Sequence, residues 1–280
     1  MCDTCGCGEG NKVTIQKPGG QLVEITHDHE HTHSHHGHEH THSHEHTHSH
    51  DDHHTHDHDD SHSHSHKIDV ESQILSRNNL LAERNRGFFL GRNIYAINLV
   101  SSPGSGKTSL LETTLERLKS EVDFYVIEGD QQTFNDADRI DKTGVPVVQI
   151  NTGTGCHLDS DMIHRAIEAL QPKSNGILFI ENVGNLVCPA LFDLGENERA
   201  VIISVTEGDD KPIKYPDMFH GSKICIINKI DLLPYVKFDV EKAKDYARRV
   251  NPDLRFFELS ATAGEGMDDW LDYLKSKVAR

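Results

Sequence analysis

The sequence predicts an α/β fold: a mainly parallel, doubly wound sheet of about seven strands, flanked by helices and preceded by a disordered histidine-rich tail. Two observations predict the sheet. Short, almost continuously apolar runs alternate with helical patterns, and the polar motifs of the chain follow the ends of those runs. Twenty histidines between His27 and His66 predict the tail, because this span has no Lys, Arg, aliphatic or aromatic residue.

Composition divides the 280-residue chain into three parts. Residues 1–26 hold a cysteine motif and, from residue 8, a linker with Gly and Pro breaks; residues 27–66 are the histidine tract; residues 67–280 form the domain. The tract cannot bury enough apolar surface to offset the entropy of ordering it, so we expect it to be disordered. The domain is long enough for one sizeable core.

The formal net charge is −17, and nine of the acidic residues lie in the histidine tract. The rest of the chain is only mildly acidic and has no basic stripe of the kind that binds nucleic acid. No apolar run approaches the roughly 18 residues that a membrane span needs, and no secretory signal opens the chain. We therefore expect a cytoplasmic protein with reduced cysteines and with neither nucleic-acid nor membrane partners.

The domain begins with a predicted helix from Lys67 to about Arg92, where apolar residues recur at helical spacing. Seven apolar runs are then predicted as strands and five stretches as helices between them. The strands are expected at 94–100, 123–128, 145–150, 176–181, 200–206, 223–228 and 255–260, and the helices at 107–120, 134–143, 159–170, 239–250 and 266–279.

The first predicted strand leads into "SSPGSGKTSLL", which matches a phosphate-binding loop (P-loop) except that Ser101 replaces its first glycine. Backbone N–H groups and a helix N-terminus would face the phosphates, Lys107 would reach the outer ones, and the Thr108 hydroxyl would hold Mg²⁺. The predicted phosphate-binding residues are Gly104, Ser105, Gly106, Lys107, Thr108 and Ser109.

Two later motifs predict a guanine site. In "INKID", Asp231 can accept hydrogen bonds from N1–H and the 2-amino group of guanine, while Lys229 lies along the base and Asn228 fixes the loop. In "LSATAG", Ser260 and Ala261 would contact the edge of the guanine base from the side opposite the "INKID" motif. Adenine lacks those donors and would leave a buried carboxylate unpaired, so GTP and GDP are favoured over ATP.

Two acids follow predicted strands where they would complete the Mg²⁺ shell, although acids can also simply cap strands. Asp130 follows "DFYVIEG", and Glu181 ends "GILFIE", with Gly184 three residues later placed to approach the γ-phosphate. Lys107, Asp130 and Glu181 are the predicted catalytic residues. Asn185 stands where fast GTPases have the Gln that orients water, so we expect slow intrinsic hydrolysis.

Three cysteines open the chain in "CDTCGC". Cys2 and Cys5 have a C-x-x-C spacing, and Cys7 adds a third soft ligand, a set that suits Ni²⁺ in a planar field or Zn²⁺ in a tetrahedral one. The redox alternative for C-x-x-C requires a following βαβ unit, whereas here a linker follows. Imidazole binds Ni, Zn and Cu alike, so the histidine tract indicates metal capacity rather than selectivity.

A second group of metal ligands lies at predicted strand ends. Cys156 and His157 follow one strand, and Cys188 lies seven residues after Glu181, so the three could form a Ni/Zn site coupled to the nucleotide. Cys225 lies inside an apolar strand and is expected to be an inert core residue. His164 and His220 lack partners in sequence and are expected to serve packing or the surface.

The chain resembles the HypB family of hydrogenase nickel-incorporation GTPases from about residue 90 to the C-terminus and, in addition, at the N-terminal cysteine motif. The motifs that carry the resemblance are "CDTCGC", the histidine tract, "SSPGSGKT", "GDQQTFNDADRI", "NTGTGCHLD", "ENVGNLVCP" and "NKIDLLP". The resemblance implies a GTPase of the signal-recognition/MinD (SIMIBI) branch that forms a homodimer on binding GTP. It also implies a tight nickel site at Cys2, Cys5 and Cys7, and a weaker Ni/Zn site at Cys156, His157 and Cys188. The implied partners are a HypA-type nickel chaperone and the [NiFe]-hydrogenase large-subunit precursor.

Three alternatives remain at this point. Urease accessory GTPases resemble this chain but typically have Cys-Pro-His where it has Cys188-Pro189-Ala190. A nickel and zinc storage protein with a regulatory GTPase fold would hold many metals in the histidine tract. A zinc-allocating GTPase would require zinc to bind more tightly than nickel at the working site, and the two metals lie close together in the affinity order.

Overall fold

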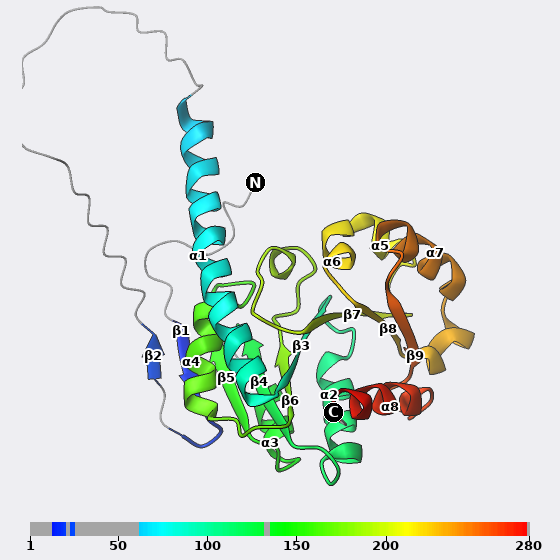
Figure 1. The fold of residues 1–280 in the computed structure, drawn as a ribbon. Coiled ribbons are helices and arrows are strands. Elements are labelled where there is room, and N and C mark those ends of the chain that lie inside the picture. The colour runs from blue at the N-terminus through cyan, green and yellow to red at the C-terminus, as the bar shows by residue number, and fades with distance from the viewer. Residues whose placement is uncertain (1–12, 21–22, 26–61, 132–134, 279–280) are drawn as a thin grey trace, which may run out of the picture.

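Seven parallel strands form most of the sheet in the part of the chain that the computed structural model describes, namely residues 13–20, 23–25, 62–131 and 135–278 (Figure 1). Each starts within two residues of its predicted start, and the predicted fold class is confirmed. The strands are β3 (Tyr95–Ser101), β4 (Phe124–Asp130), β5 (Val147–Asn151), β6 (Ile177–Glu181), β7 (Glu198–Ser204), β8 (Ile224–Asn228) and β9 (Arg255–Leu259).

Two antiparallel strands, β1 (Val13–Gln16) and β2 (Val23–Ile25), extend the sheet beyond β5, so the interpretation of residues 8–26 as a linker is wrong at these positions. The described sheet has the order β2-β1-β5-β4-β6-β3-β7-β8-β9. Val13 and Ile15 are buried, because alternate residues of β1 face the core when β1 pairs with the edge of β5. The Gly and Pro residues between the strands form the turn of a hairpin.

Helices cover both faces of the sheet (Figure 1). One face packs against α1 and α4 and, farther along, against α6 and α7, while the opposite face packs against α2, α3 and α8. The helices are α1 (His62–Arg92), α2 (Lys107–Leu118), α3 (Asn135–Asp141), α4 (Ser160–Leu170), α5 (Lys211–Lys214), α6 (Pro216–His220), α7 (Val240–Val250) and α8 (Met267–Val278), with single 3₁₀ segments at Cys188–Ala190 and Ile230–Tyr235.

The first helix is longer than the sequence predicts. α1 begins at His62 rather than Lys67, so the prediction of disorder over 27–66 is wrong for its last five residues. The N-terminal part of α1 extends away from the domain, while its C-terminal part packs along α4 (Figure 1). A helix that is already anchored extends at little cost, since each added residue forms one more backbone hydrogen bond.

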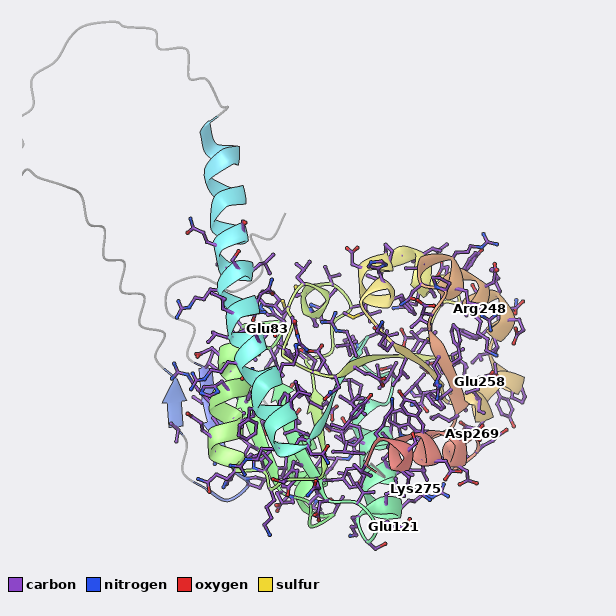
Figure 2. All side chains as sticks on the ribbon, viewed as in Figure 1. Glu83, Glu121, Arg248, Glu258, Asp269 and Lys275 are labelled. Atoms are coloured by element: carbon purple, nitrogen blue, oxygen red, sulfur yellow. The ribbon has the colours of Figure 1, made fainter. Side chains whose placement is uncertain are left out.

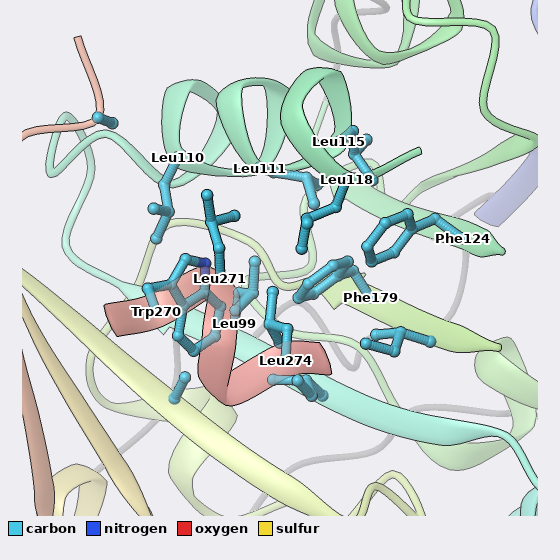
Figure 3. Close-up of a cluster of buried hydrophobic side chains, with 14 of the residues drawn as sticks. Leu99, Leu110, Leu111, Leu115, Leu118, Phe124, Phe179, Trp270, Leu271 and Leu274 are labelled. Carbon is cyan, nitrogen blue, oxygen red and sulfur yellow. The ribbon is translucent and has the colours of Figure 1, made fainter. Parts of the chain in front are cut away.

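The largest cluster of buried side chains joins α2 and α8 to the sheet (Figure 3). Leu115 on α2 is fully buried in this cluster. Trp270 of α8 belongs to the same cluster, and its indole Nε1 donates a hydrogen bond to Thr114 Oγ1 at 3.0 Å. Phe124 and Phe179 stack on the strands below, with ring centroids 5.8 Å apart. This packing fixes the helix that follows the phosphate loop.

Charged side chains project from the outside of the fold, as Glu121 and Arg248 show in Figure 2. Surface pairs such as Lys275 with Glu121, at 3.7 Å, contribute little to stability because water screens them. No described helix combines the length and the apolarity that crossing a bilayer requires.

The core around α2 predicts a stability effect. Replacing Leu115 by Ala removes fully buried methyl groups from this cluster, so we expect the free energy of unfolding to fall by about 2–5 kcal/mol. Urea unfolding followed by the fluorescence of the single Trp measures this change. The neighbouring exposed residue supplies the control, and Glu116→Ala should change stability by less than about 0.5 kcal/mol. Equal effects of the two variants would contradict this account of the core.

Candidate nucleotide and metal site

The phosphate-binding loop connects β3 to α2 as predicted. Gly104 and Gly106 have φ angles of 76° and 94°, and a Cβ on Gly106 would lie 2.6 Å from the side-chain nitrogen of Asn228. Only glycine fits such a backbone at such a close approach. Lys107 Nζ donates to Ser101 Oγ at 3.0 Å, so the serine that replaces the first glycine of the motif accepts a hydrogen bond from the loop lysine.

The predicted base-binding residues lie against this loop. Asn228 Nδ2 donates to Ser105 O at 2.9 Å, and Lys229 Nζ donates to Gly104 O at 2.6 Å. Asn228 Oδ1 in turn accepts from Ala261 N at 3.2 Å, which joins both predicted base motifs to the phosphate loop. Ser260 is buried beside Ala261, and Asp231 lies half-buried in the turn after Lys229.

A cavity of about 450 Å³ opens beside the phosphate loop. Glu181 contributes a buried carboxylate, of which Oε1 accepts from Thr108 Oγ1 at 2.7 Å. Burial raises the pKa of Glu181, whereas the charge of Lys107 and the hydrogen bond from Thr108 lower it. The loop residues from Pro103 to Ser109 line the cavity, as do Glu128, Gly129, Asp130, Asp136, Arg139, Glu181, Asn182, Gly184 and Lys229.

Mg²⁺, which a phosphate-loop fold implies, fits the donors present here. It prefers oxygen ligands, and Glu181 Oε2 is buried without a hydrogen-bond partner among the described residues. The hydroxyl of Thr108 and the carboxylate of Asp130 line the same cavity. A buried carboxylate oxygen that lacks a donor is costly unless a cation or another donor meets it.

Glu128 is a cavity residue that the sequence analysis did not identify. It lies on β4 directly opposite Glu181 of β6, is buried, and has no partner for Oε2 within the described ranges. Burial, followed by the negative charges of Glu181 and Asp130, raises the pKa of Glu128 to about 9. An acid that directly follows the apolar run "FYVI", before the strand ends, is the sequence signal that could have identified it.

Arg139 joins α3 to α2 at the rim of the cavity. Its guanidinium donates to Glu112 Oε2 at 2.6 Å, to Ser109 Oγ at 3.2 Å and to Asp136 Oδ1 at 3.3 Å. Ser109 belongs to the predicted phosphate-binding residues, and the arginine therefore couples the end of the phosphate loop to α3.

The predicted domain metal ligands lie together. One ligand atom from each of Cys156, His157 and Cys188 falls within 4.8 Å of the others. Cys156 Sγ lies 3.8 Å from His157 Nδ1, and Cys188 is buried on the 3₁₀ turn after β6. Burial lowers the pKa of His157, although Asp159 opposes the shift, so the imidazole is neutral and its lone pair is available to a metal near pH 7.

Both ligand-bearing loops adjoin the nucleotide cavity. Thr152, before Cys156, donates its backbone N–H to the carbonyl of Asp130 at 2.9 Å, and its hydroxyl donates to Gly155 O at 2.7 Å. Gly184, before Cys188, lies against the phosphate loop, where a Cβ would be 3.2 Å from Pro103 Cα. Each loop therefore touches a residue that lines the cavity.

Several predicted residues lie outside this arrangement. Cys2, Cys5 and Cys7 and residues 27–61 of the histidine tract are outside the described residues. Cys225 is buried within β8, where burial raises the pKa of its thiol to about 12, in keeping with its expected place in the core. His164 lies 3.3 Å from Glu168 on α4.

Comparison with known proteins identifies the family. A family model for the CobW/HypB/UreG nucleotide-binding domain matches residues 95–258. The hydrogenase maturation factor HypB of Escherichia coli (strain K12) is 59% identical over 210 residues, which cover 75% of this chain and 72% of that protein. The structure of HypB from Helicobacter pylori in complex with nickel is 40% identical, with a TM-score of 0.68, and the match covers 72% of this chain and 94% of that one. HypB from Archaeoglobus fulgidus has the same TM-score and identity, with 72% of this chain and 99% of that one covered. The chain belongs to the HypB family of hydrogenase maturation factors.

Proposed function

We propose that this chain is a GTP-hydrolysing nickel metallochaperone that delivers Ni²⁺ for maturation of the [NiFe]-hydrogenase large subunit. One observation carries the proposal: the three clustered ligands Cys156, His157 and Cys188 lie on two loops that both touch the walls of the phosphate-loop cavity. A nucleotide in that cavity can therefore bias the geometry of a metal site. The relative of known structure from Helicobacter pylori was solved with nickel, which supports nickel as the cargo.

The nucleotide chemistry follows from the cavity residues. The phosphate loop from Gly104 to Ser109 would bind the phosphates through backbone N–H groups, and Lys107 would exchange its hydrogen bond to Ser101 for the outer phosphates. Asn228, Lys229, Asp231, Ser260 and Ala261 would hold guanine. Mg²⁺, held by Thr108, Asp130 and Glu181, would supply charge neutralisation at the transferred phosphoryl group.

Gly184 would couple hydrolysis to the metal. It lies against Pro103 of the phosphate loop, four residues before Cys188, so loss of the γ-phosphate would let this segment move and shift one ligand relative to the other two. Asn185 in place of a water-orienting Gln supports slow hydrolysis, as in a switch. A change in nickel affinity between nucleotide states would then time the release of the cargo.

The remaining parts of the proposal rest on the family. They are a GTP-dependent homodimer, a HypA-type chaperone and the hydrogenase precursor as partners, a cytoplasmic location, Zn²⁺ as a second metal, and a separate tight nickel site at Cys2, Cys5 and Cys7. Three soft ligands so close in sequence suit nickel or zinc in a reduced compartment.

The proposal predicts that the nucleotide changes nickel affinity at the domain site. In a full chain with Cys2, Cys5 and Cys7 replaced by Ala, we expect nickel affinity in the presence of GDP and of a non-hydrolysable GTP analogue to differ by about 5- to 150-fold. Titration against a competing chelator, read at the thiolate-to-nickel absorption band, measures both affinities.

Two cysteine variants control this titration. Cys156→Ala should weaken both the band and the nickel affinity, because it removes one of the two clustered cysteines. Cys225→Ala, in the core and with a thiol that stays protonated, should keep both the band and the difference between nucleotides. Equal affinities with the two nucleotides in the parent chain would remove the coupling mechanism.

The guanine site predicts a change of base specificity. Asp231→Asn keeps one oxygen that can accept from N1–H but replaces the acceptor for the 2-amino group of guanine by an NH₂ group, which can instead donate to the 2-oxo group of xanthine. We expect GDP affinity to fall by roughly 10²-fold or more and XDP affinity to rise, measured with fluorescent nucleotide analogues. Asp253→Asn, at an exposed position, should leave both affinities unchanged. Retention of tight GDP binding by Asp231→Asn would place the base elsewhere.

The raised pKa of Glu128 predicts a pH dependence of folding. The pKa of this carboxyl is about 9 in the folded state and about 4.5 for an ordinary carboxyl, so with rising pH the unfolded state loses its proton first and is favoured. Relative to Glu128→Gln, the wild type should lose about 1 kcal/mol of stability per pH unit between those two values and no more above them.

Urea unfolding at a series of pH values, in EDTA and without nucleotide, measures the difference between the two proteins. Glu116→Gln, at an exposed position on α2, provides the matched control. A stability difference that stays constant from pH 5 to pH 9 would show that the folded state does not hold the proton on Glu128.

A further inference from the structure

The part of α1 from residue 72 to residue 92 touches both loops that carry the clustered metal ligands, although it supplies no ligand itself. We call residues 152–160 the first ligand segment, with Cys156 and His157, and residues 182–196 the second ligand segment, with Cys188. The segments touch directly where His157 stacks on Phe192, with ring centroids 4.0 Å apart, and where Ser160 Oγ donates to Asp193 O at 2.6 Å.

Asn78 of α1 bridges the two segments. Its Oδ1 accepts from the backbone N–H of Ser160 at 2.9 Å, and its Nδ2 donates to the carbonyl of Asp193 at 2.8 Å. Asn78 is 5% exposed, so water cannot readily replace either hydrogen bond.

Asn85, two helical turns later on the same face of α1, bridges them again. Its fully buried Nδ2 donates to Ser160 O at 2.9 Å and to Leu194 O at 3.2 Å. Two carbonyl acceptors require the NH₂ group here, and Asn85 Oδ1 has no partner in the described structure. The position therefore demands a donor of two hydrogen bonds, and a carboxylate would repel both carbonyls.

Backbone packing holds the second ligand segment to the same stretch of helix. Gly195 has a φ angle of 87°, and a Cβ there would lie 2.5 Å from Ala82 O and 2.8 Å from Asn85 Cβ. Arg86 also donates to Asp193 Oδ2 at 2.6 Å and to Glu196 O at 3.0 Å. The second segment is therefore fixed to α1 by its backbone as well as by side chains.

We propose that Asn78 and Asn85 are positioning residues of the Cys156–His157–Cys188 site, each holding the two ligand segments at one spacing so that their ligand atoms converge on one ion. The inference rests on the proposed function, because it assumes that the three clustered residues bind metal. Metal affinity depends on this spacing because the ligands come from two loops. If the loops are already ordered before the metal binds, binding does not have to offset the entropic cost of ordering them. Outer partners that orient metal ligands typically change metal affinity about 10- to 100-fold when mutated.

The test uses Co²⁺, because cobalt bound to thiolate absorbs in bands that cobalt on histidine alone does not produce. The parent is the full chain with Cys2, Cys5 and Cys7 replaced by Ala, so the cobalt–thiolate bands report on the domain site. We expect Asn85→Asp to weaken Co²⁺ binding about 10- to 100-fold and to shift the d–d bands, with GDP affinity unchanged. Asn78→Ala removes one bridge and serves as a second variant should Asn85→Asp fail to fold. Asn79→Ala, at the exposed neighbouring position, should behave as the parent.

The outcomes distinguish the hypothesis that Cys156, His157 and Cys188 bind metal from the hypothesis that Asn78 and Asn85 position them. Absence of thiolate bands in the parent would refute the metal site, and the positioning role with it. If the parent shows the bands and Asn85→Asp and Asn78→Ala bind Co²⁺ with the parent's affinity and spectrum, the metal site stands and the positioning role is wrong. A parallel loss of GDP and Co²⁺ affinity in both variants would also overturn it, because it would indicate general unfolding.

Discussion

The hydrogen bond from Thr108 to Glu181 joins the phosphate loop to the strand that leads into the second ligand segment. Thr108 lies on the first turn of α2, and Glu181 is the last residue of β6. A nucleotide with its cation would compete for the same hydroxyl and carboxylate, so under the proposed function occupation of the cavity would act directly on the end of β6. From there the chain passes Gly184 and reaches Cys188 with no intervening helix. This short covalent path needs no long-range relay.

The first ligand segment has its own connection to the cavity. Thr152 donates hydrogen bonds to the backbone carbonyl of Asp130, which connect the end of β4 to the start of the Cys156 loop. Two paths of different origin thus meet at one cluster of ligands, and α1 spans the segments at the far side. Such an arrangement allows a small change at the cavity to alter the distances among three ligand atoms. Metal affinity depends on these distances, because each metal–ligand bond has a preferred length.

Much of this architecture could be predicted from the sequence, because the motifs follow the ends of the segments whose hydrophobic pattern predicts strands. Most of the seven parallel strands are almost continuously apolar runs, and the phosphate loop has its glycines where the backbone requires a positive φ. The two strands β1 and β2 were missed because each is too short to show a period, and their pairing depends on the free edge of β5. Asn78 and Asn85 carry no motif either. Their role follows only from backbone groups that lie more than 70 residues away in sequence.

Among the described residues the domain cluster offers three candidate ligands, not the four of a structural metal site. Structural zinc sites are closed by four protein ligands, whereas sites that exchange a ligand keep a position open. Within the described residues the cluster contains two thiols and one imidazole, and Cys156 is only half-buried, which leaves one side accessible. An incoming ligand can bind an ion held by three ligands before any of the three dissociates. If that approach comes from an acceptor protein, transfer needs no free ion in solution, and a modest change in the spacing of the two ligand segments is enough to favour it.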